Sequence, residues 1–448
     1  MTGPPPGRRA SGLPASGLPA SGAAGQLLRG VLVSGGRQVP DGVVAVRGDR
    51  LHWVGPAAEW PGPAGELPPP DPDSYLLPGL VDAHCHGGAG SGFPEAELDG
   101  VRAAVAHHRR HGTTSMLASL VSAPAAVLRR RVRLLAPLVR AGELAGVHLE
   151  GPFLAAARCG AQDPGAIVPG DPELLRRLLA DAGGTVRSVT LAPETERCAE
   201  LLRVLDGYGV LPSLGHTDAT AAATRAAVAR LGGAPVSATH LFNAMPPMHH
   251  RAPGPVGACL AAAARGEMVL ELVADGVHLA DETVAAVFDL VGPDRVALVT
   301  DAMAAAGMPD GRYPLGSMAV DVVDGVARLA ATGSRPAESG RPIAGGTARL
   351  VDVLRRVVRG AGVPLPDAVR AATATPARLL GIDAEVGDLV PGRRADVLVT
   401  DPELAVRAVL RAGEWVTGTP PTGTATTGTA TTGTATTGTA TAAAGGPR

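Results

Sequence analysis

The sequence contains no lysine, so arginine supplies all 40 of its basic side chains. Every chemical role that needs a lysine side chain is therefore excluded. Charged residues make up only 18% of the chain, and the formal net charge is -2. This balance gives no basic surface for nucleic acid or for an anionic membrane, and neither is predicted as a partner.

Cysteine is also scarce, and the four residues, Cys85, Cys159, Cys198 and Cys259, form no CxxC pair. Their spacing excludes a disulfide framework and a zinc ribbon. No apolar run approaches the roughly 20 residues that a membrane-spanning helix needs. The first residues are rich in Pro, Gly and Ser, where a signal peptide would need a continuous apolar segment. We therefore expect a cytoplasmic protein.

Low-complexity sequence occupies both ends, with ASGLP repeats near the start and TTGTA repeats near the end. Neither can bury enough apolar surface to offset the entropy of ordering, so residues 1–26 and 417–448 are predicted to be disordered. The segments 27–77 and 384–416 instead contain short β-like patterns punctuated by Gly and Pro. We expect them to form one small β-sandwich domain built from both chain ends.

The central segment, residues 78–383, alternates apolar runs with stretches rich in Ala, Leu and Arg that suit helices. Eight strand–helix alternations over this length predict an α/β fold, a (β/α)8 TIM-like barrel. The predicted strands are Gly79–Ala83, Thr113–Leu117, Ala145–Leu149, Val186–Leu191, Val210–Leu214, Val236–Thr239, Met268–Ala274 and Val296–Thr300.

Polar side chains stand at the C-terminal ends of these strands: His84, His86, Glu150, His216, His240, His278 and Asp301. This is the face where TIM-barrel enzymes build active sites. The HxH pattern alone is more simply explained as two strand histidines that meet water or a backbone carbonyl. The whole set, however, would be costly to bury unless a cation held it together. It predicts a metal site, with Cys85 packed on the opposite face of its strand.

Imidazole and carboxylate ligands suit zinc or a similar divalent transition metal. Glu150, His216 and His240 would leave an open position for water. The metal would lower the pKa of that water from about 15.7 towards neutrality and so supply hydroxide to a substrate carbonyl. Asp301 is placed to take the water's proton and later give it to a leaving amine.

The remaining histidines have structural explanations. His148 shares the inward face of its strand with Glu150 and is expected to hydrogen-bond to groups at the site. His107, His108 and His111 lie on an arginine-rich helical stretch and are expected to be solvated.

Six motifs, in order within residues 27–416, carry a resemblance to a known family: PGLVDAHCHG, GVHLEGPF, SLGHTDAT, THLFNAMPPMHHR, ADGVHL and LVTDAM. The chain resembles the amidohydrolase superfamily, and within it the N-acetylglucosamine-6-phosphate deacetylases. The resemblance implies removal of the acetyl group from N-acetylglucosamine 6-phosphate, an amino sugar phosphate, in amino sugar catabolism. It also implies that Glu150, His216 and His240 bind the principal divalent metal, with Asp301 as the catalytic acid/base.

A second metal is implied by His84 and His86, which match the members of the family that keep both histidines. Glu150 would then bridge the two ions. Many other amidohydrolases bridge two metals with a carboxylated lysine. Because this chain has no lysine, that whole subclass is excluded.

The resemblance also implies a set of substrate-binding residues: Ala161, Gln162, Asn243, Ala244, Arg251, Asp275, His278, Ile343, Ala344 and Gly345. Asn243 and Ala244 would contact the sugar phosphate, and Arg251 would be its charged partner, because a guanidinium fork suits a phosphate. His278 would bind or polarise the acetyl carbonyl. Family members are often homodimers that complete each phosphate site across the interface.

One position departs from the family pattern, which usually reads GAHDP where this chain reads GAQDP. Gln162 therefore replaces a histidine of the active site. A glutamine can still donate and accept hydrogen bonds, but it cannot become a cation. We expect this departure to bear on turnover and on the exact sugar specificity, and not on the metal chemistry.

Two other kinds of function remain open. The first is a related amidohydrolase, such as an N-acetylgalactosamine-6-phosphate deacetylase or a deaminase. The glutamate of HLEGPF and the phosphate element that ends at Arg251 argue against a deaminase, whereas the sugar epimer is not readable. The second is an inactive barrel that serves as a binding or assembly module. Retention of Asp301 and of every principal ligand argues against it.

Overall fold

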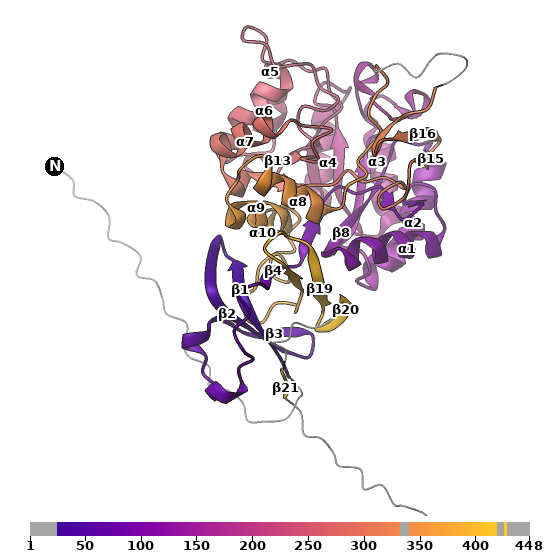
Figure 1. The fold of residues 1–448 in the computed structure, drawn as a ribbon. Coiled ribbons are helices and arrows are strands. Elements are labelled where there is room, and N and C mark those ends of the chain that lie inside the picture. Colours follow the sequence, from indigo (N-terminus) through magenta and orange to yellow (C-terminus); the bar gives the residue numbers. More distant parts are fainter. Residues whose placement is uncertain (1–24, 332–339, 419–424, 428–448) are drawn as a thin grey trace, which may run out of the picture.

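The computed structural model describes residues 25–331, 340–418 and 425–427. These residues form a strand–helix barrel and a sheet domain, which lies below the barrel in Figure 1 next to α9 (Leu365–Ala372) and α10 (Ala374–Leu379). No helix within the described ranges is both long and apolar enough to cross a membrane.

Eight parallel strands form the barrel, and each pairs with its neighbour in chain order. All eight predicted strands are present, with small differences at their ends. Two backbone hydrogen bonds just past the ends of the first and last strands close the barrel. The Asp301 amide donates to the His84 carbonyl at 2.9 Å, and the His86 amide donates to the Ala302 carbonyl at 2.7 Å. The strands are β5 (Leu80–Asp82), β8 (Thr113–Leu120), β9 (Gly146–Glu150), β10 (Val186–Leu191), β11 (Leu211–Leu214), β12 (Ser237–Ala238), β13 (Val269–Leu272) and β14 (Val296–Leu298).

Helices connect consecutive strands and cover the outside of the barrel. They are α1 (Leu98–Arg110), α2 (Ala125–Arg140), α3 (Pro172–Ala182), α4 (Cys198–Tyr208), α5 (Ala221–Arg230), α6 (Gly254–Ala264), α7 (Asp281–Val291) and α8 (Leu350–Arg359). Their ends follow local sequence rules. The Asp171 side chain caps α3 by accepting hydrogen bonds from two backbone amides, and Gly183 ends that helix in the left-handed conformation.

The barrel interior is layered along its axis. At the N-terminal end of the strands, Val81, Leu117 and Val269 form an apolar cluster that is closed by Leu379 and Leu380 from α10 and its C-cap. Hydroxyl and other polar side chains follow above this cluster, and the predicted metal ligands lie at the C-terminal ends. The candidate ligands therefore lie at the C-terminal face, where barrels of this kind build their active sites.

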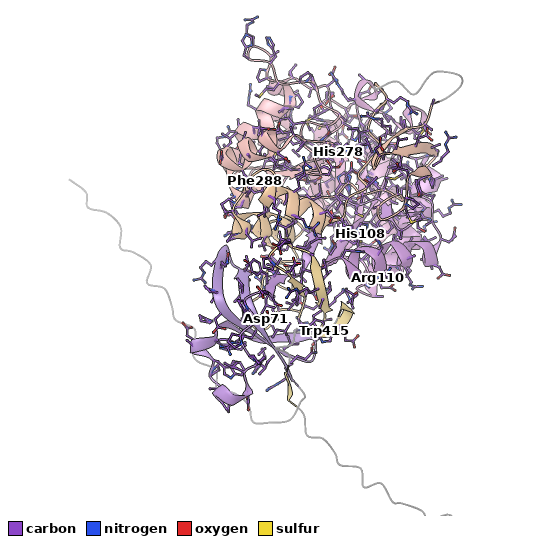
Figure 2. All side chains as sticks on the ribbon, viewed as in Figure 1. Asp71, His108, Arg110, His278, Phe288 and Trp415 are labelled. Carbon is purple, nitrogen blue, oxygen red and sulfur yellow. The ribbon has the colours of Figure 1, made fainter. Side chains whose placement is uncertain are left out.

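The sheet domain draws its strands from both ends of the chain, as predicted, but they form one continuous eight-stranded sheet and not two separate sheets. The sheet curls over one apolar cluster that includes Leu28, Val44, Val399 and Leu410, with Trp415 at its margin (Figure 2). The strands are β1 (Gly25–Ser34), β2 (Arg37–Arg47), β3 (Arg50–Pro56), β4 (Tyr75–Pro78), β18 (Val397–Thr400), β19 (Val406–Arg411), β20 (Glu414–Gly418) and β21 (Ala425–Thr427).

The two predicted tails lie mostly outside the described residues. At their inner ends, β1 begins at Gly25 and β20 continues to Gly418. In addition, β21 pairs antiparallel with β1. The expected lack of order therefore does not hold for these short segments, where backbone hydrogen bonds to the sheet offset the entropy of ordering.

A three-stranded antiparallel sheet after the last barrel strand was not predicted. It consists of β15 (Gly311–Leu315), β16 (Met318–Val323) and β17 (Val326–Leu329). It packs over the site through a small apolar cluster that contains Val121, Leu315 and Ala344. The short strands β6 (Gly87–Gly88) and β7 (Ser91–Gly92) and five single-turn 3₁₀ segments complete the described structure: Ala57–Glu59, Ala64–Glu66, Ala156–Arg158, Pro164–Ala166 and Pro293–Arg295.

Candidate metal centre and substrate cavity

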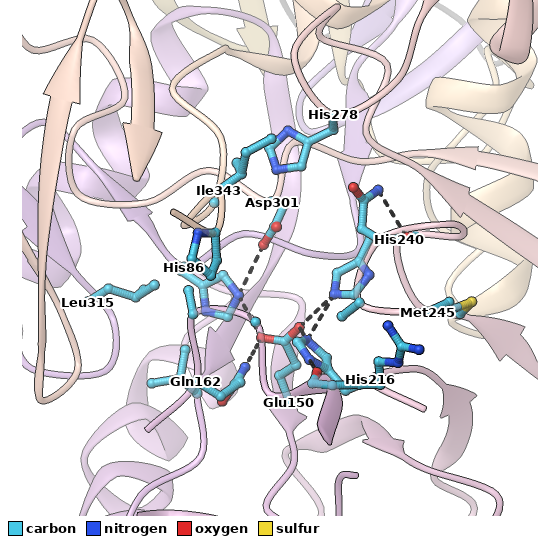
Figure 3. Close-up of a pocket in the computed structure, with 18 of the residues that line it drawn as sticks. His86, Glu150, Gln162, His216, His240, Met245, His278, Asp301, Leu315 and Ile343 are labelled. Atoms are coloured by element: carbon cyan, nitrogen blue, oxygen red, sulfur yellow. Dashed lines mark hydrogen bonds and ion pairs between the residues drawn. The ribbon is translucent and has the colours of Figure 1, made fainter. Parts of the chain in front are cut away.

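Glu150, His216 and His240 converge from the ends of three barrel strands, as shown in Figure 3. The Oε1 atom of Glu150 lies 2.9 Å from His216 Nε2 and 3.0 Å from His240 Nε2, and the two Nε2 atoms are 3.1 Å apart. All three side chains are almost completely buried. Ligand atoms of a tetrahedral zinc site lie about 3.3 Å from one another, so this spacing suits one divalent ion.

His84, His86 and Asp301 form a second group beside the first. Their contacts are similarly close, with 3.0 Å between the two Nε2 atoms and 3.3 and 3.2 Å from them to Asp301 Oδ1. The two groups meet at Glu150, whose Oε2 atom is 3.2 Å from His86 Nε2. A carboxylate in this position could therefore contact ions in both groups.

Hydrogen bonds from the outer nitrogen, Nδ1, orient three of the imidazoles so that Nε2 faces the candidate metal position. Nδ1 of His216 lies 2.8 Å from the Arg158 carbonyl, Nδ1 of His86 lies 3.2 Å from the Ser119 carbonyl, and Nδ1 of His84 lies 3.2 Å from Glu271. Because these partners only accept, each Nδ1 carries the proton. When such a ring is neutral, its Nε2 points a lone pair at carboxylate oxygens, an arrangement that a bound cation would satisfy.

The backbone is strained at the same places. His216, His240 and Asp301 have positive φ angles of 46°, 29° and 49°, although none is a glycine. Each residue lies just beyond the end of its strand. Strain of this kind is about 1–3 kcal/mol per residue and concentrates at functional sites, where surrounding structure holds it.

The electrostatics of the two groups favour ionised carboxylates. Burial disfavours a charged imidazole, but Asp301 and Glu271 raise the pKa of His84 to about 9. Burial also opposes a charge on His86, but Asp301 and Glu150 raise the pKa of this imidazole to about 10. Burial would raise the pKa of Glu150 and Asp301, but the imidazoles lower both below their usual values. Both carboxylates are thus held in the form that can bind a metal or accept a proton.

Two buried polar side chains, Glu271 and His148, support the site from below. Glu271 was not predicted, and its only signal is an acidic residue inside an otherwise apolar strand; it holds His84. His148 behaves as predicted and hydrogen-bonds to Ser119 Oγ at 3.0 Å and to Thr190 Oγ1 at 2.8 Å. Burial lowers the pKa of His148 well below its usual value, so its ring stays neutral.

A cavity of about 370 Å³ lies over both groups. Of the residues implied to bind substrate, it is lined by Ala161, Gln162, Asn243, Ala244, His278, Ile343 and Gly345. Figure 3 shows Leu315 and Met245 on opposite sides of the candidate metal ligands. Arg158 also lines the cavity, with its guanidinium 2.7 Å from the exposed Asp218. The sequence analysis missed these three lining residues because their types are common elsewhere in the chain.

Three implied substrate residues do not line this cavity. Ala344 is fully buried in the apolar cluster under the three-stranded sheet, because its backbone pairs with Ala327 and turns its methyl group away. Asp275 contacts His278, with 2.8 Å between Oδ2 and Nδ1. Arg251 is exposed on its loop.

The Asp275–His278 pair sets the charge of His278. Burial opposes ionisation of both groups, but their hydrogen bond lowers the pKa of Asp275 and raises that of His278. Because Nδ1 of His278 faces Asp275, its Nε2 is the nitrogen that can face the cavity, where a charged imidazole would donate a hydrogen bond.

The expected solvation of the helix α1 histidines is wrong for His107 and His108, which are 9% and 0% exposed. His108, labelled in Figure 2, donates from Nε2 to the Gly87 carbonyl at 2.9 Å, directly under the loop that carries His84 and His86. A Cβ atom at Gly88 would lie 2.8 Å from this nitrogen. The arginines that suggested a solvated face occupy other sides of the helix.

An eight-stranded parallel barrel with two candidate metal-ligand groups at its C-terminal face is an architecture that suits a metal-dependent hydrolase. Residues 75–428 match the amidohydrolase family, and the chain belongs to this family.

Within the family, the chain is similar to sugar-phosphate deacetylases. It is 34% identical to the N-acetylglucosamine-6-phosphate deacetylase of Bacillus subtilis (strain 168) over 341 residues, 75% of this chain and 82% of the relative. It is 35% identical to the N-acetylgalactosamine-6-phosphate deacetylase of Escherichia coli O157:H7 over 347 residues, 77% and 86% of the two chains.

A solved structure extends this similarity. It is that of a mutant N-acetyl-D-glucosamine-6-phosphate deacetylase from Mycobacterium smegmatis in complex with N-acetyl-D-glucosamine-6-phosphate. It shares 41% sequence identity and a TM-score of 0.79 with this chain, and the match covers 88% of this chain and 100% of that one.

Proposed function

We propose that this protein hydrolyses the N-acetyl group of N-acetylglucosamine 6-phosphate to give glucosamine 6-phosphate and acetate. The observation that carries the proposal is the convergence of Glu150, His216 and His240 beside Asp301, in a cavity large enough for an amino sugar. The similarity to deacetylases over three quarters of the chain or more supports the same substrate class.

We propose zinc as the metal, because imidazole and carboxylate ligands suit it. When bound, a divalent ion lowers the pKa of water and polarises a carbonyl. Asp301, ionised and facing the cavity, would accept a proton from the attacking water and return it to the leaving nitrogen. His278, charged beside Asp275, would donate a hydrogen bond from Nε2 to the acetyl oxygen.

We also propose that the protein acts as a homodimer. Arg251 is exposed and outside the cavity of its own chain, so a role in phosphate binding would require it to reach the cavity of a second copy. Arg158 is the arginine that lines the cavity within one chain, and it would add a second positive charge near the phosphate.

The decisive experiment is acetate release from N-acetylglucosamine 6-phosphate by the full-length protein, before and after chelation and after Zn²⁺ is restored. We expect activity to disappear with chelation and to return with the metal. N-acetylgalactosamine 6-phosphate and unphosphorylated N-acetylglucosamine serve as comparison substrates. Faster turnover of the galacto epimer would reassign the substrate, and no acetate from either phosphate by metal-loaded protein would refute the deacetylase function.

A further inference from the structure

Both ends of the Gln162 amide are engaged by protein groups. Its Oε1 atom accepts a hydrogen bond from the Ser122 backbone amide at 2.6 Å, and its Nε2 donates to Oε2 of Glu150 at 2.6 Å. The dashed line between Gln162 and Glu150 in Figure 3 marks the second contact. Only 4% of the residue is exposed. One amide hydrogen and one lone pair of Oε1 are the hydrogen-bonding capacity that remains for a substrate.

The orientation of this amide is determined by its neighbours. Reversing it would place the NH₂ group against the Ser122 N–H and the carbonyl oxygen against the Glu150 carboxylate. Both contacts would be repulsive, since two donors or two acceptors would face each other. Gln162 therefore presents a donor to Glu150 and an acceptor to the Ser122 amide.

We propose that Gln162 is a positioning residue for the metal centre, and not a residue that recognises the sugar. Its hydrogen bond holds Oε2 of Glu150, so that Oε1 stays directed at His216 and His240. The inference rests on the proposed function only in taking these three residues as metal ligands. Partners that orient metal ligands in this way commonly change metal affinity by 10–100-fold when they are removed.

The surroundings of Gln162 suit such a role. Through Ser122 and Glu150, its side chain joins the C-terminal ends of the neighbouring strands β8 and β9. The next residue, Asp163, accepts a hydrogen bond from Ser317 Oγ at 2.8 Å and thus ties the loop to the turn between β15 and β16. An amide held by a fixed loop can orient Glu150 with little further loss of side-chain freedom.

The test is Gln162→Leu, which keeps the approximate size of the side chain and removes both hydrogen bonds. We expect the affinity for the first equivalent of Zn²⁺, measured by competition with a chromogenic chelator, to fall by about 10–100-fold. The absorption spectrum of the Co²⁺-substituted protein should also change, because the ligand geometry is altered. At saturating metal, the loss should appear in kcat more than in KM. Should this variant fail to fold, Gln162→Met gives the same comparison with a more flexible side chain.

Two further variants make the result specific. Gln26→Leu removes an amide hydrogen bond in the sheet domain, where Gln26 Nε2 donates to the Gly413 carbonyl at 2.8 Å, and should leave Zn²⁺ affinity unchanged. Gln162→His should retain the function that Gln162→Leu loses, since a neutral imidazole also offers one acceptor and one donor. We expect its Zn²⁺ affinity and its kcat to stay within about fivefold of the wild type, or roughly 1 kcal/mol.

The competing role, a contact to the sugar, gives a different pattern. Unchanged Zn²⁺ affinity and an unchanged Co²⁺ spectrum in Gln162→Leu, with a raised KM, would overturn the proposal. A gain of about 100-fold in kcat on Gln162→His would do the same, because it would mean that a cation is missing at this position. Zn²⁺ affinity and the Co²⁺ spectrum are measured without substrate, so these two readouts are independent of whether the protein is a deacetylase.

Discussion

Glu271 and His84 lie 3.2 Å apart, Oε2 to Nδ1, across the barrel interior between strands β13 and β5. Ser237 Oγ donates to the other oxygen of Glu271 at 3.3 Å, so this carboxylate is held in place from the opposite side. The pair connects the second candidate metal-ligand group to the polar layer below it. A ligating histidine usually donates its outer N–H to such an acceptor, which fixes the ring and increases its basicity.

Changing Glu271 should therefore affect the second group selectively. In Glu271→Gln we expect the second equivalent of Zn²⁺ to bind about 10-fold more weakly or worse, while the first equivalent binds as in the wild type. The metal content after dialysis, measured by elemental analysis, shows how many equivalents of Zn²⁺ each protein retains. Two equivalents retained with wild-type affinity would show that Glu271 does not support a metal site.

Asp301→Asn should separate proton transfer from metal binding. The amide cannot accept a proton, so we expect kcat to fall by at least about 100-fold, the usual scale of acid/base catalysis. Zn²⁺ affinity at the principal group should change little, because Asp301 belongs to the second group. Steady-state kinetics and metal titration are the measurements, and a near-normal kcat would remove Asp301 from the chemistry.

Arg251→Ala should lower kcat/KM for N-acetylglucosamine 6-phosphate by about 10–150-fold, the loss expected for one charge-assisted hydrogen bond. The unphosphorylated sugar should be affected far less. Mixing this variant with Asp301→Asn tests whether Arg251 acts across subunits. A mixed dimer then contains one complete site, so about a quarter of wild-type activity should return after random exchange. No recovery on mixing would place Arg251 outside a shared site.

Stability should depend on pH through His108. Burial lowers its pKa to about 4, so the folded protein keeps this imidazole neutral while the unfolded chain, with an ordinary pKa of about 6.5, takes up a proton. The stabilisation is fully present above pH 6.5 and is lost as the pH falls towards 4, by about 2 kcal/mol between pH 7 and pH 5.

His108→Gln preserves a donor towards the Gly87 carbonyl but cannot titrate. We expect its free energy of unfolding, from urea denaturation, to fall less than that of the wild type over this pH range. All proteins are compared after metal removal, so that release of metal at low pH does not contribute. His250→Gln, at an exposed position, should follow the wild type. Parallel curves for all three proteins would contradict the prediction.

The barrel was predictable because its strands are short, mostly apolar runs, and six of the eight are ended or followed by a histidine, glutamate or aspartate. His216, His240 and Asp301 could be placed on one face for this reason alone, since all strands of a parallel barrel end at the same side. The three-stranded sheet was missed because the segment from Gly311 to Leu329 mixes charged, apolar and turn residues without a helix or barrel period.

The residues whose surroundings were predicted wrongly, or not at all, depend on contacts between segments that are distant in the sequence. His108 is buried because Gly88, on another element, leaves room for its ring. Ala344 was grouped with its neighbours in the sequence, but its methyl group packs under a sheet that had not been predicted. The partners of Gln162 are 40 and 12 residues away along the chain, at Ser122 and Glu150. Such contacts follow from tertiary packing and not from local preference.

The pairing of strands from both chain ends has a consequence for folding during translation. Strand β4 pairs with β18, and Pro78 and Val397 in that pairing are separated by about 320 residues. At synthesis rates of about 5–20 residues per second, the N-terminal strands must wait roughly 15–60 s for their partners to be made. During this interval Leu76 and Leu77 lack their partner strand, and their open edge is an aggregation hazard for the nascent protein.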